Sequence, residues 1–210
     1  MIRVLVADDH PVVRVGLREI LSQQRDIAVL GEAGTGADVL KLVAQKAWDV
    51  IVLDVTLPDR SGLDVLKEIK RERPKLPVLI LTIASEDQYA VRALRSGASG
   101  YLTKESAPEE LVQAVRKVVA GGRYVSPKLA ERLAVMIDRD AEQPPHDQLS
   151  EREFQVFRLL ASGRAVSQVA EELHLSVKTV STYRARVLEK MNLRTNAELT
   201  VYAVRNHLVE

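Results

Sequence analysis

Short apolar runs alternate with amphipathic segments along residues 1–121. In the segments between the runs, apolar residues recur at helical spacing, as Val12, Val15 and Leu21 do in the first of them. Several runs are rich in β-branched residues, which is typical of strands buried on both faces. The runs are Val4–Ala7, Ile27–Glu32, Val50–Leu53, Val78–Leu81 and Gly100–Leu102. This alternation predicts repeated βα units whose right-handed crossovers build a parallel sheet covered by helices.

The order of these elements predicts two domains of different class. Residues 1–121 are expected to form a doubly wound, flavodoxin-like α/β domain with a five-stranded parallel sheet. Residues 122–148 are expected to be a linker with a helix over 126–138, where Pro127 suits the first turn. The stretch 140–148 holds two prolines and is expected to be exposed. Residues 149–210 carry no strand signal, and their four helical segments predict an all-α domain.

The all-α domain has the pattern of a helix-turn-helix unit. Ser150 and Glu153 form a capping box at the start of its first helix. A second helix is expected over residues 166–173, and a third is expected after the N-cap Ser176. One face of this third helix is apolar and carries Val177, Val180, Val187, Leu188 and Met191. The opposite face carries Lys178, Thr182, Ala185, Arg186 and Glu189.

Composition narrows the chemistry and the location. The chain has no cysteine, which excludes disulfides, thiolate metal sites and cysteine nucleophiles. Its apolar runs fall short of the roughly 20 residues of a membrane helix. A strand-like N-terminus argues against a signal peptide, so a cytoplasmic protein is expected. The formal net charge is only +1. A local basic cluster opposed only by Glu189 comprises Lys178, Arg184, Arg186, Lys190 and Arg194.

Charged and hydroxyl side chains follow the predicted strands of the first domain. Asp8 and Asp9 follow the first strand and Asp54 follows the third, while Thr82 and Lys104 mark the last two strand ends. Ligands of doubly wound sheets bind outside the carboxyl ends of the strands, so these side chains are expected to converge. Three carboxylates repel one another, and hard oxygen ligands favour Mg²⁺ as the cation between them. A carboxylate can also act as a nucleophile towards phosphorus.

These residues resemble the receiver domain of bacterial two-component response regulators. The match comprises Asp8-Asp9, Asp54 with Pro58 and Gly62 behind it, Thr82, Tyr101 and Lys104. The resemblance implies that a sensor histidine kinase phosphorylates Asp54. It implies that Asp9 binds Mg²⁺ directly and Asp8 through water, with the carbonyl of Thr56 completing the ligands. The residues implied to contact the phosphoryl group, or to change rotamer with it, are Lys104, Thr82 and Tyr101.

Residues 149–206 resemble the LuxR-type DNA-binding domain of the NarL/FixJ class of regulators. The supporting runs are LSEREFQVFRLLASG and VAEELHLSVKTVSTYRARVLEKMNLRTNAEL. The resemblance implies that the third helix lies in the major groove of double-stranded DNA and that the final helix, 196–205, is a homodimer interface. Base readout is implied at Ser181, Thr182 and Ala185. Contacts to the phosphate backbone are expected from Lys178, Thr179, Lys190 and Arg194, and Arg186 is expected at phosphate or guanine.

Together these features predict a phosphorylation-controlled transcription regulator that dimerises on phosphorylation or on DNA and is not an enzyme. An aspartyl-phosphate phosphatase would carry a second Asp two residues after Asp54, where this chain has Thr56. A nucleotide or flavin binder would need a Gly-rich or Ser/Thr-rich loop after the first strand. A protein-binding adaptor leaves the last domain unexplained. A receiver that works without phosphorylation stays open, and the bulky Ile83 is expected to affect access to the phosphoryl group.

Overall fold

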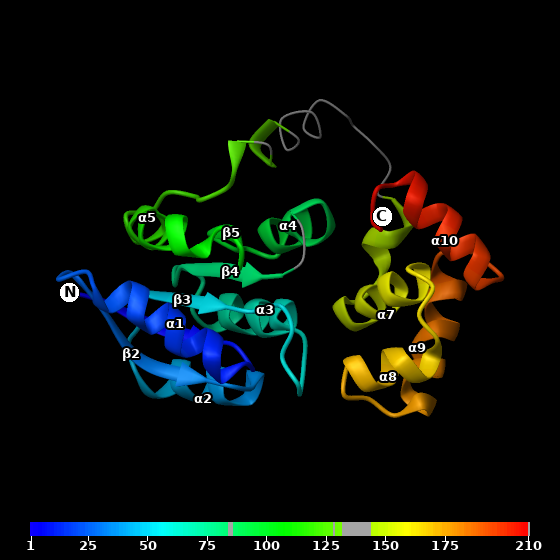
Figure 1. The fold of residues 1–210 in the computed structure, drawn as a ribbon, viewed down its shortest axis with the longest axis horizontal. Helices are drawn as coiled ribbons and strands as arrows, with labels where there is room; N and C mark the ends of the chain where they lie inside the picture. The colour runs from blue at the N-terminus through cyan, green and yellow to red at the C-terminus, as the bar shows by residue number, and fades with distance from the viewer. Residues whose placement is uncertain (84–85, 128, 132–143, 210) are drawn as a thin grey trace. The chain divides into compact units, whose positions relative to one another are not determined.

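The computed structural model describes residues 1–83, 86–127, 129–131 and 144–209 (Figure 1). The chain divides into two compact units, Met1–Val135 and Met136–Glu210. In the described part of the chain, no helix combines the length and the apolar character needed to cross a bilayer. The helix expected over 126–138 is helical at Pro127 and over 129–131, and the rest of it lies outside the described residues.

The first unit is built on one parallel sheet. Its strands lie in the order β2-β1-β3-β4-β5, and every described pair runs parallel. The strands are β1 (Ile2–Ala7), β2 (Ile27–Ala33), β3 (Val50–Leu53), β4 (Val78–Thr82) and β5 (Gly100–Thr103). The predicted sheet is therefore confirmed, with four of its strands one or two residues longer than their apolar runs. The order reverses direction between β1 and β3, which is where doubly wound sheets place their ligands.

Helices connect the strands and cover the sheet (Figure 1). They are α1 (Pro11–Ser22), α2 (Gly36–Gln45), α3 (Gly62–Glu72), α4 (Glu86–Arg95) and α5 (Ala107–Val119). Leu21 of α1 and Val115 of α5 belong to one apolar cluster with alternate residues of β1, β3 and β4. α2 and α3 pack side by side and bury Val39 and Leu66. Fully burying such side chains contributes about 1.5–3 kcal/mol each, so the core holds the strand ends in fixed positions.

The second unit is a helix-turn-helix assembly. Its helices are α7 (Glu151–Ala161), α8 (Val166–Glu172), α9 (Val177–Lys190) and α10 (Asn196–Arg205). The Ser150–Glu153 capping box is present at the start of α7. A small core comprises Val156, Leu160, Val169, Ala170, Leu173 and Val180. His174 adopts a positive φ of 52° in the turn between α8 and α9, which lets the chain reverse within a few residues.

Two details of this unit differ from the sequence expectation. Val177 was placed on the buried face of α9, but 53% of it is exposed. It is the first residue of the helix, one turn ahead of the core residue Val180. Within the stretch expected to be exposed linker, Pro145–Gln148 form a 3-10 turn. His146 of this turn lies 2.8 Å from the hydroxyl of Tyr202, so the end of the linker is packed on the second unit.

Candidate functional site

The carboxyl ends of β1, β3 and β5 bring two carboxylates and an ammonium together. Asp8 follows β1 and Asp54 follows β3, and only 1% and 2% of these residues are exposed. Lys104 follows β5, and its Nζ lies 2.6 Å from Asp8 Oδ2 and 2.8 Å from Asp54 Oδ2. One ammonium thus bridges two buried carboxylates, because side chains that follow parallel strands meet at the same edge of the sheet.

Burial determines the protonation equilibria of this pocket. It raises the pKa of Asp54 to about 6, because the carboxylate loses its hydration, although Lys104 acts in the opposite direction. The negative charge of Asp8 adds to the rise. Burial also disfavours the ammonium of Lys104, but Asp54 and Asp8 outweigh this effect and hold the Lys104 pKa above its usual value. At neutral pH the pocket holds a charged Lys104 beside an Asp54 that is close to its titration range.

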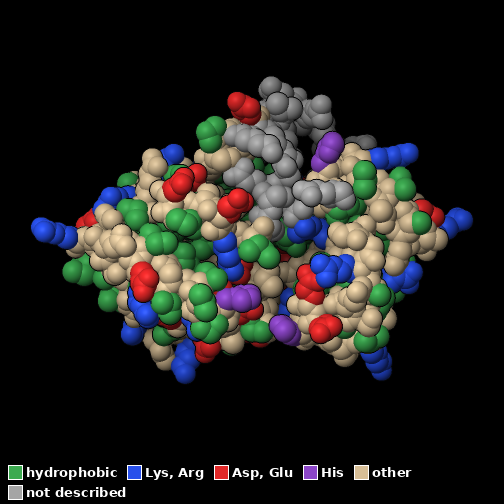
Figure 2. All heavy atoms as spheres, viewed as in Figure 1, with side chains coloured by type: hydrophobic (Ala, Val, Ile, Leu, Met, Phe, Trp, Pro, Cys, Tyr) green, Lys and Arg blue, Asp and Glu red, His purple; other side chains and the backbone are tan. Residues whose placement is uncertain are grey.

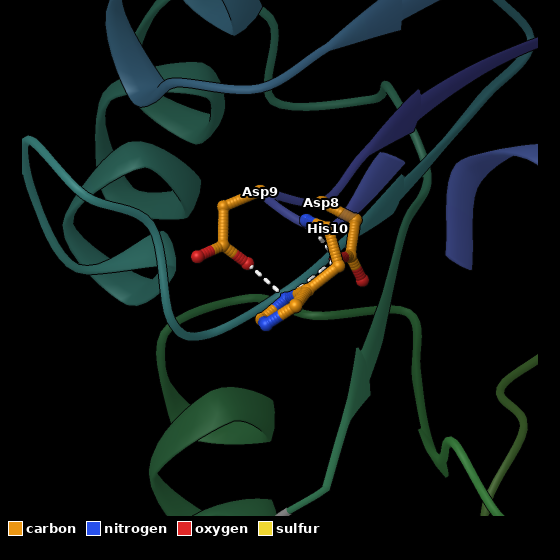
Figure 3. Close-up of side chains that lie close together, drawn as sticks. All are labelled: Asp8, Asp9 and His10. Atoms are coloured by element: carbon orange, nitrogen blue, oxygen red, sulfur yellow. Dashed lines mark hydrogen bonds and ion pairs between the residues drawn. The ribbon is translucent and has the colours of Figure 1, made fainter. Parts of the chain in front are cut away.

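Asp9 and His10 complete the pocket from the turn between β1 and α1 (Figure 3). The imidazole Nδ1 of His10 lies 2.5 Å from Asp9 Oδ1 and 3.4 Å from Asp8 Oδ1. The backbone N–H of His10 also donates a 2.9 Å hydrogen bond to Asp8 Oδ1. The sequence prediction left His10 out of the site. Its position directly after two acids was the available signal, but the rotamer that turns it back towards them is a property of the folded turn.

The same turn offers ligands for a cation. One donor atom from each of Asp8, Asp9 and His10 lies within 4.8 Å of the other two. Asp8 Oδ2 and Asp9 Oδ1 are buried, and the nitrogens that face them are Lys104 Nζ at 2.6 Å and His10 Nδ1 at 2.5 Å. Carboxylate oxygens buried in this way suit a hard cation. Asp54, also predicted as a ligand, lies outside this group of three and is connected to Asp8 through Lys104.

The loop after β3 positions Asp54 through backbone contacts. The backbone N–H of Thr56 donates a 3.2 Å hydrogen bond to Asp54 Oδ1. The N–H of Gly62, the first residue of α3, donates to the carbonyl of Val55 at 2.7 Å. A Cβ at position 62 would lie 1.9 Å from the carbonyl oxygen of Asp54. Only glycine permits this approach, so Gly62 lets α3 begin directly against the backbone of the candidate nucleophile.

Thr82 and Tyr101 lie on the two strands beyond β3. Both residues are fully buried, with 0% of each exposed. The carbonyl of Thr82 accepts a 2.8 Å hydrogen bond from the N–H of Lys104, which ties the end of β4 to the residue that reaches Asp54. The N–H of Tyr101 donates to the carbonyl of Tyr124 at 3.0 Å. Ile83, directly after Thr82, is 84% exposed.

A second candidate site is the outer face of α9. The exposed residues along this helix include Val177, Lys178, Ser181, Thr182, Ala185, Arg186 and Lys190. Thr179 is only partly exposed, and its hydroxyl lies 2.7 Å from that of the N-cap Ser176. In the view of Figure 2, basic and acidic side chains are interspersed over both units. This agrees with the formal net charge of +1.

Some cations near α9 are engaged within the unit. Lys190 Nζ lies 2.6 Å from Oε2 of Glu153, a nearly buried residue of the α7 capping box. Arg184, a member of the predicted basic cluster, donates a 2.7 Å hydrogen bond from its Nε to the side-chain oxygen of Asn196. Arg194 is exposed, and its backbone N–H donates to Glu198. Lys178 and Arg186 are the predicted cationic contacts on the outer face of the helix itself.

Two family models match the chain along these two units. Residues 4–116 match the response regulator receiver domain, and residues 147–203 match the bacterial regulatory proteins of the luxR family. The chain is 40% identical to the response regulator GacA of Pseudomonas aeruginosa over 211 residues, covering 100% of this chain and 99% of GacA. The chain belongs to the response regulators. It combines a receiver domain with a LuxR-type DNA-binding domain.

Solved structures of the response regulator RcsB are similar to this regulator over nearly its whole length. One is RcsB from Salmonella enterica serovar Typhimurium bound to promoter rprA with the phosphomimetic BeF₃⁻. It is 26% identical, has a TM-score of 0.64 and covers 97% of this chain and 99% of that chain. Another contains two RcsB dimers bound to two parallel DNAs, with 26% identity, a TM-score of 0.60 and coverage of 97% and 98%.

In this response regulator, the receiver residues predicted from the sequence lie at one edge of the sheet. Asp8, Asp54 and Lys104 are in direct contact, and Asp9 joins them through His10. The predicted residues of the LuxR-type domain are less uniform. Ser181, Thr182 and Ala185 share an exposed face with Lys178 and Arg186, whereas Lys190 is held by Glu153.

Proposed function

We propose that Asp54 is the phosphoacceptor of this regulator and that its phosphorylation controls DNA binding. The main support is the position of Asp54 at the carboxyl edge of the sheet. Its carboxylate is nearly buried, and its Oδ2 lies 2.8 Å from the ammonium of Lys104. A phosphohistidine of a sensor kinase is the proposed donor. The N–P bond breaks, its electron pair returns to the histidine, and an oxygen of Asp54 forms the new O–P bond. Lys104 offsets the charge of the transferring group.

The pocket fits Mg²⁺. Asp9 would hold the ion directly and Asp8 through water, with an oxygen of Asp54 and the carbonyl of Thr56 as the other ligands. The close approach of ligand atoms from Asp8, Asp9 and His10, within 4.8 Å of one another, supports a cation at this turn. A bound Mg²⁺ offsets the charge of the carboxylates and of the phosphoryl oxygens. His10 has to turn away from Asp9 Oδ1 to free that oxygen, because its Nδ1 lies only 2.5 Å from it.

The change at Asp54 spreads through the strand ends. Thr82 ends β4, and its carbonyl accepts a hydrogen bond from the backbone N–H of Lys104, so the end of β4 is coupled to the backbone that carries Lys104. The Thr82 hydroxyl then hydrogen-bonds the phosphoryl group. Tyr101, on the neighbouring strand, changes rotamer in the space that Thr82 vacates. These movements bias a receiver with two conformations, and the modification shifts the population between them.

The DNA-binding domain inserts α9 into the major groove of double-stranded DNA as a homodimer. Two recognition helices are needed because a single one makes few phosphate contacts. The dimer contact is assigned to α10, where Val201 and Val204 are each 50% exposed. The RcsB dimers on DNA support this arrangement. Phosphorylation promotes dimerisation and promoter binding, and the regulator acts in the cytoplasm, where both the kinase and the chromosome are reached.

The chain is a regulator rather than a catalyst with turnover. A phosphatase of the aspartyl-phosphate type needs a general acid two residues beyond its nucleophile, and Thr56 cannot serve as one. In the structure, Thr56 instead donates its backbone N–H to Asp54 Oδ1. Position 56 therefore supplies no general acid that would speed the loss of the phosphoryl group from Asp54.

Labelling by a small phosphodonor tests the acceptor assignment. The full chain is incubated with acetyl phosphate and Mg²⁺, and the intact mass is recorded for wild type, Asp54→Ala and Asp26→Asn. Asp26 is an exposed carboxylate paired with Arg116 and serves as a matched control. We expect wild type and Asp26→Asn to gain one phosphoryl group and Asp54→Ala to gain none. Labelling of Asp54→Ala at the wild-type rate would overturn the assignment.

A further inference from the structure

The outer face of α9 presents few hydrogen-bond donors. Its exposed residues at helical spacing are Val177, Lys178, Ser181, Thr182, Ala185 and Arg186. Val177 and Ala185 have apolar side chains, and the two hydroxyl residues lie between them. Neither Ser nor Thr is bulky enough to cover its neighbours. The chemistry of this face therefore depends on where the two hydroxyl groups direct their protons.

Both hydroxyl protons are used inside the helix. Ser181 Oγ donates to the carbonyl of Val177 at 2.9 Å, and Thr182 Oγ1 donates to the carbonyl of Lys178 at 3.0 Å. A hydroxyl has one proton, so neither group donates to a base while these bonds persist. Each oxygen still accepts a hydrogen bond, and Thr182 retains its methyl group. Apart from Lys178 and Arg186, the side chains of this face are thus apolar or offer hydrogen-bond acceptors.

Guanine is recognised in the major groove through its N7 and O6 acceptors, which require donors. On the described face of α9, those donors are the side chains of Lys178 and Arg186. Arg184 is only partly exposed, with its Nε bonded to Asn196, and Lys190 is paired with Glu153. Thymine instead presents a methyl group, and adenine presents an amino donor. The thymine methyl matches an apolar side chain. The adenine amino group matches a hydroxyl oxygen that can accept a hydrogen bond but whose proton is already donated within the helix.

We infer that α9 recognises A·T base pairs mainly through thymine methyl groups, which contact Val177, Thr182 and Ala185. The inference rests on the proposed DNA-binding function and names the base chemistry of that site. The Ser181 oxygen accepts from an adenine amino group. Val177 is then a specificity-determining residue, because its exposed side chain at the start of α9 contacts a thymine methyl group. Removing one contacted methyl weakens binding about fourfold, the equivalent of one buried methyl or methylene.

Base analogues test this directly. The full chain, treated with phosphodonor and Mg²⁺, selects its site from a random DNA pool. Each thymine of the selected half-site is then replaced singly by deoxyuridine, which lacks only the methyl group. Thymines in the flanks serve as controls. We expect about fourfold weaker binding at two or more half-site positions and no change in the flanks, at one fixed salt concentration.

Two variants of Thr182 assign the contact. Thr182→Ser keeps the hydroxyl and removes the methyl, so it should bind thymine and deoxyuridine equally at one position. Thr182→Val keeps the methyl and removes the hydroxyl, so it should retain the difference. Both changes are on an exposed position, and circular dichroism checks that the fold is kept. The inference is overturned if Thr182→Ser still distinguishes thymine from deoxyuridine while Thr182→Val does not. It is also overturned if wild type binds its site specifically but no deoxyuridine substitution weakens binding. In both cases the proposed function stands. Absence of any DNA binding overturns both.

Discussion

The acidic pocket of the receiver and the outer face of α9 differ in burial and in charge: the pocket holds buried charged groups, and the middle of the α9 face holds exposed neutral ones. In the pocket, Asp8 and Asp54 are 1% and 2% exposed, and their charges have to be met within 3 Å by Lys104. On α9, Thr182 and Ala185 are exposed, and the Thr182 hydroxyl donates to a carbonyl of the helix itself. Buried charge restricts a residue to very few roles, whereas an exposed neutral side chain is constrained mainly by what it binds.

Replacing Asp9 should have the largest effect on the acidic pocket. Asp9→Ala removes a proposed direct ligand, so Mg²⁺ affinity should fall by at least about tenfold, the cost of losing even an indirect partner of a metal site. Titration calorimetry of the full chain measures it, with Asp26→Asn as the control. The fold should survive, because Asp9 contacts only His10 among the described ion pairs. Unchanged Mg²⁺ affinity would contradict the metal site and would mean that Asp8 and Asp9 are only charged residues before the start of α1.

Replacing Asp54 by asparagine should stabilise the receiver while it abolishes phosphorylation. The folded-state pKa of about 6 lies above the ordinary value of 3.8, so the folded state binds the proton more tightly than the unfolded state. Wild type therefore loses stability as the pH rises from about 4 through 6. Asp54→Asn escapes this loss, and we expect a gain of about 1–3 kcal/mol at neutral pH that disappears near pH 4.

Urea unfolding at both pH values measures that gain. The fluorescence of Trp48, the one tryptophan of the chain, follows the receiver, where Trp48 is 6% exposed. Lys104 keeps Asp8 as a partner in the variant, so no charge is stranded. Lower stability of Asp54→Asn at neutral pH would mean that the carboxylate supports the fold, contrary to the pocket described here.

Replacing either of two lysines of α9 should have a smaller effect, which is on the salt dependence of DNA binding. Lys178 is exposed on the outer face, whereas Lys190 is 2.6 Å from Glu153. Lys178→Ala should reduce the slope of log affinity against log salt by about one unit, as expected for one phosphate contact. Lys190→Ala should leave that slope nearly unchanged. Fluorescence anisotropy over a salt series compares the two variants. Equal changes in slope would show that Lys190 exchanges Glu153 for phosphate.

The same contrast explains what the sequence could predict. Asp8, Asp54 and Lys104 follow three strands, and the geometry of a parallel sheet brings strand ends together without knowledge of rotamers. The contact between His10 and Asp9 depends on a side-chain torsion in one turn, and nothing in the residue pattern fixes it. Lys190 and Glu153 lie 37 residues apart and meet only when α7 packs against α9.

Exposed positions of the second unit were also beyond sequence reasoning. Val177 has the periodicity of a core residue, but as the first residue of α9 it lies a full turn ahead of the core residue Val180. Ser181 and Thr182 were predicted at the base-reading face, yet the direction of their protons is set by carbonyls one turn earlier. Helical periodicity assigns residues to a face and leaves open which atoms that face presents.

Phosphorylation of Asp54 is proposed to control DNA binding. Its most direct test is the affinity for one selected DNA site, with and without acetyl phosphate and Mg²⁺, for wild type and Asp54→Ala at one salt concentration. We expect phosphodonor to tighten binding by wild type by about tenfold, within the usual range of allosteric coupling, and to leave Asp54→Ala unchanged. Equal affinities for phosphorylated and unphosphorylated wild type, or an equal gain in Asp54→Ala, would contradict it.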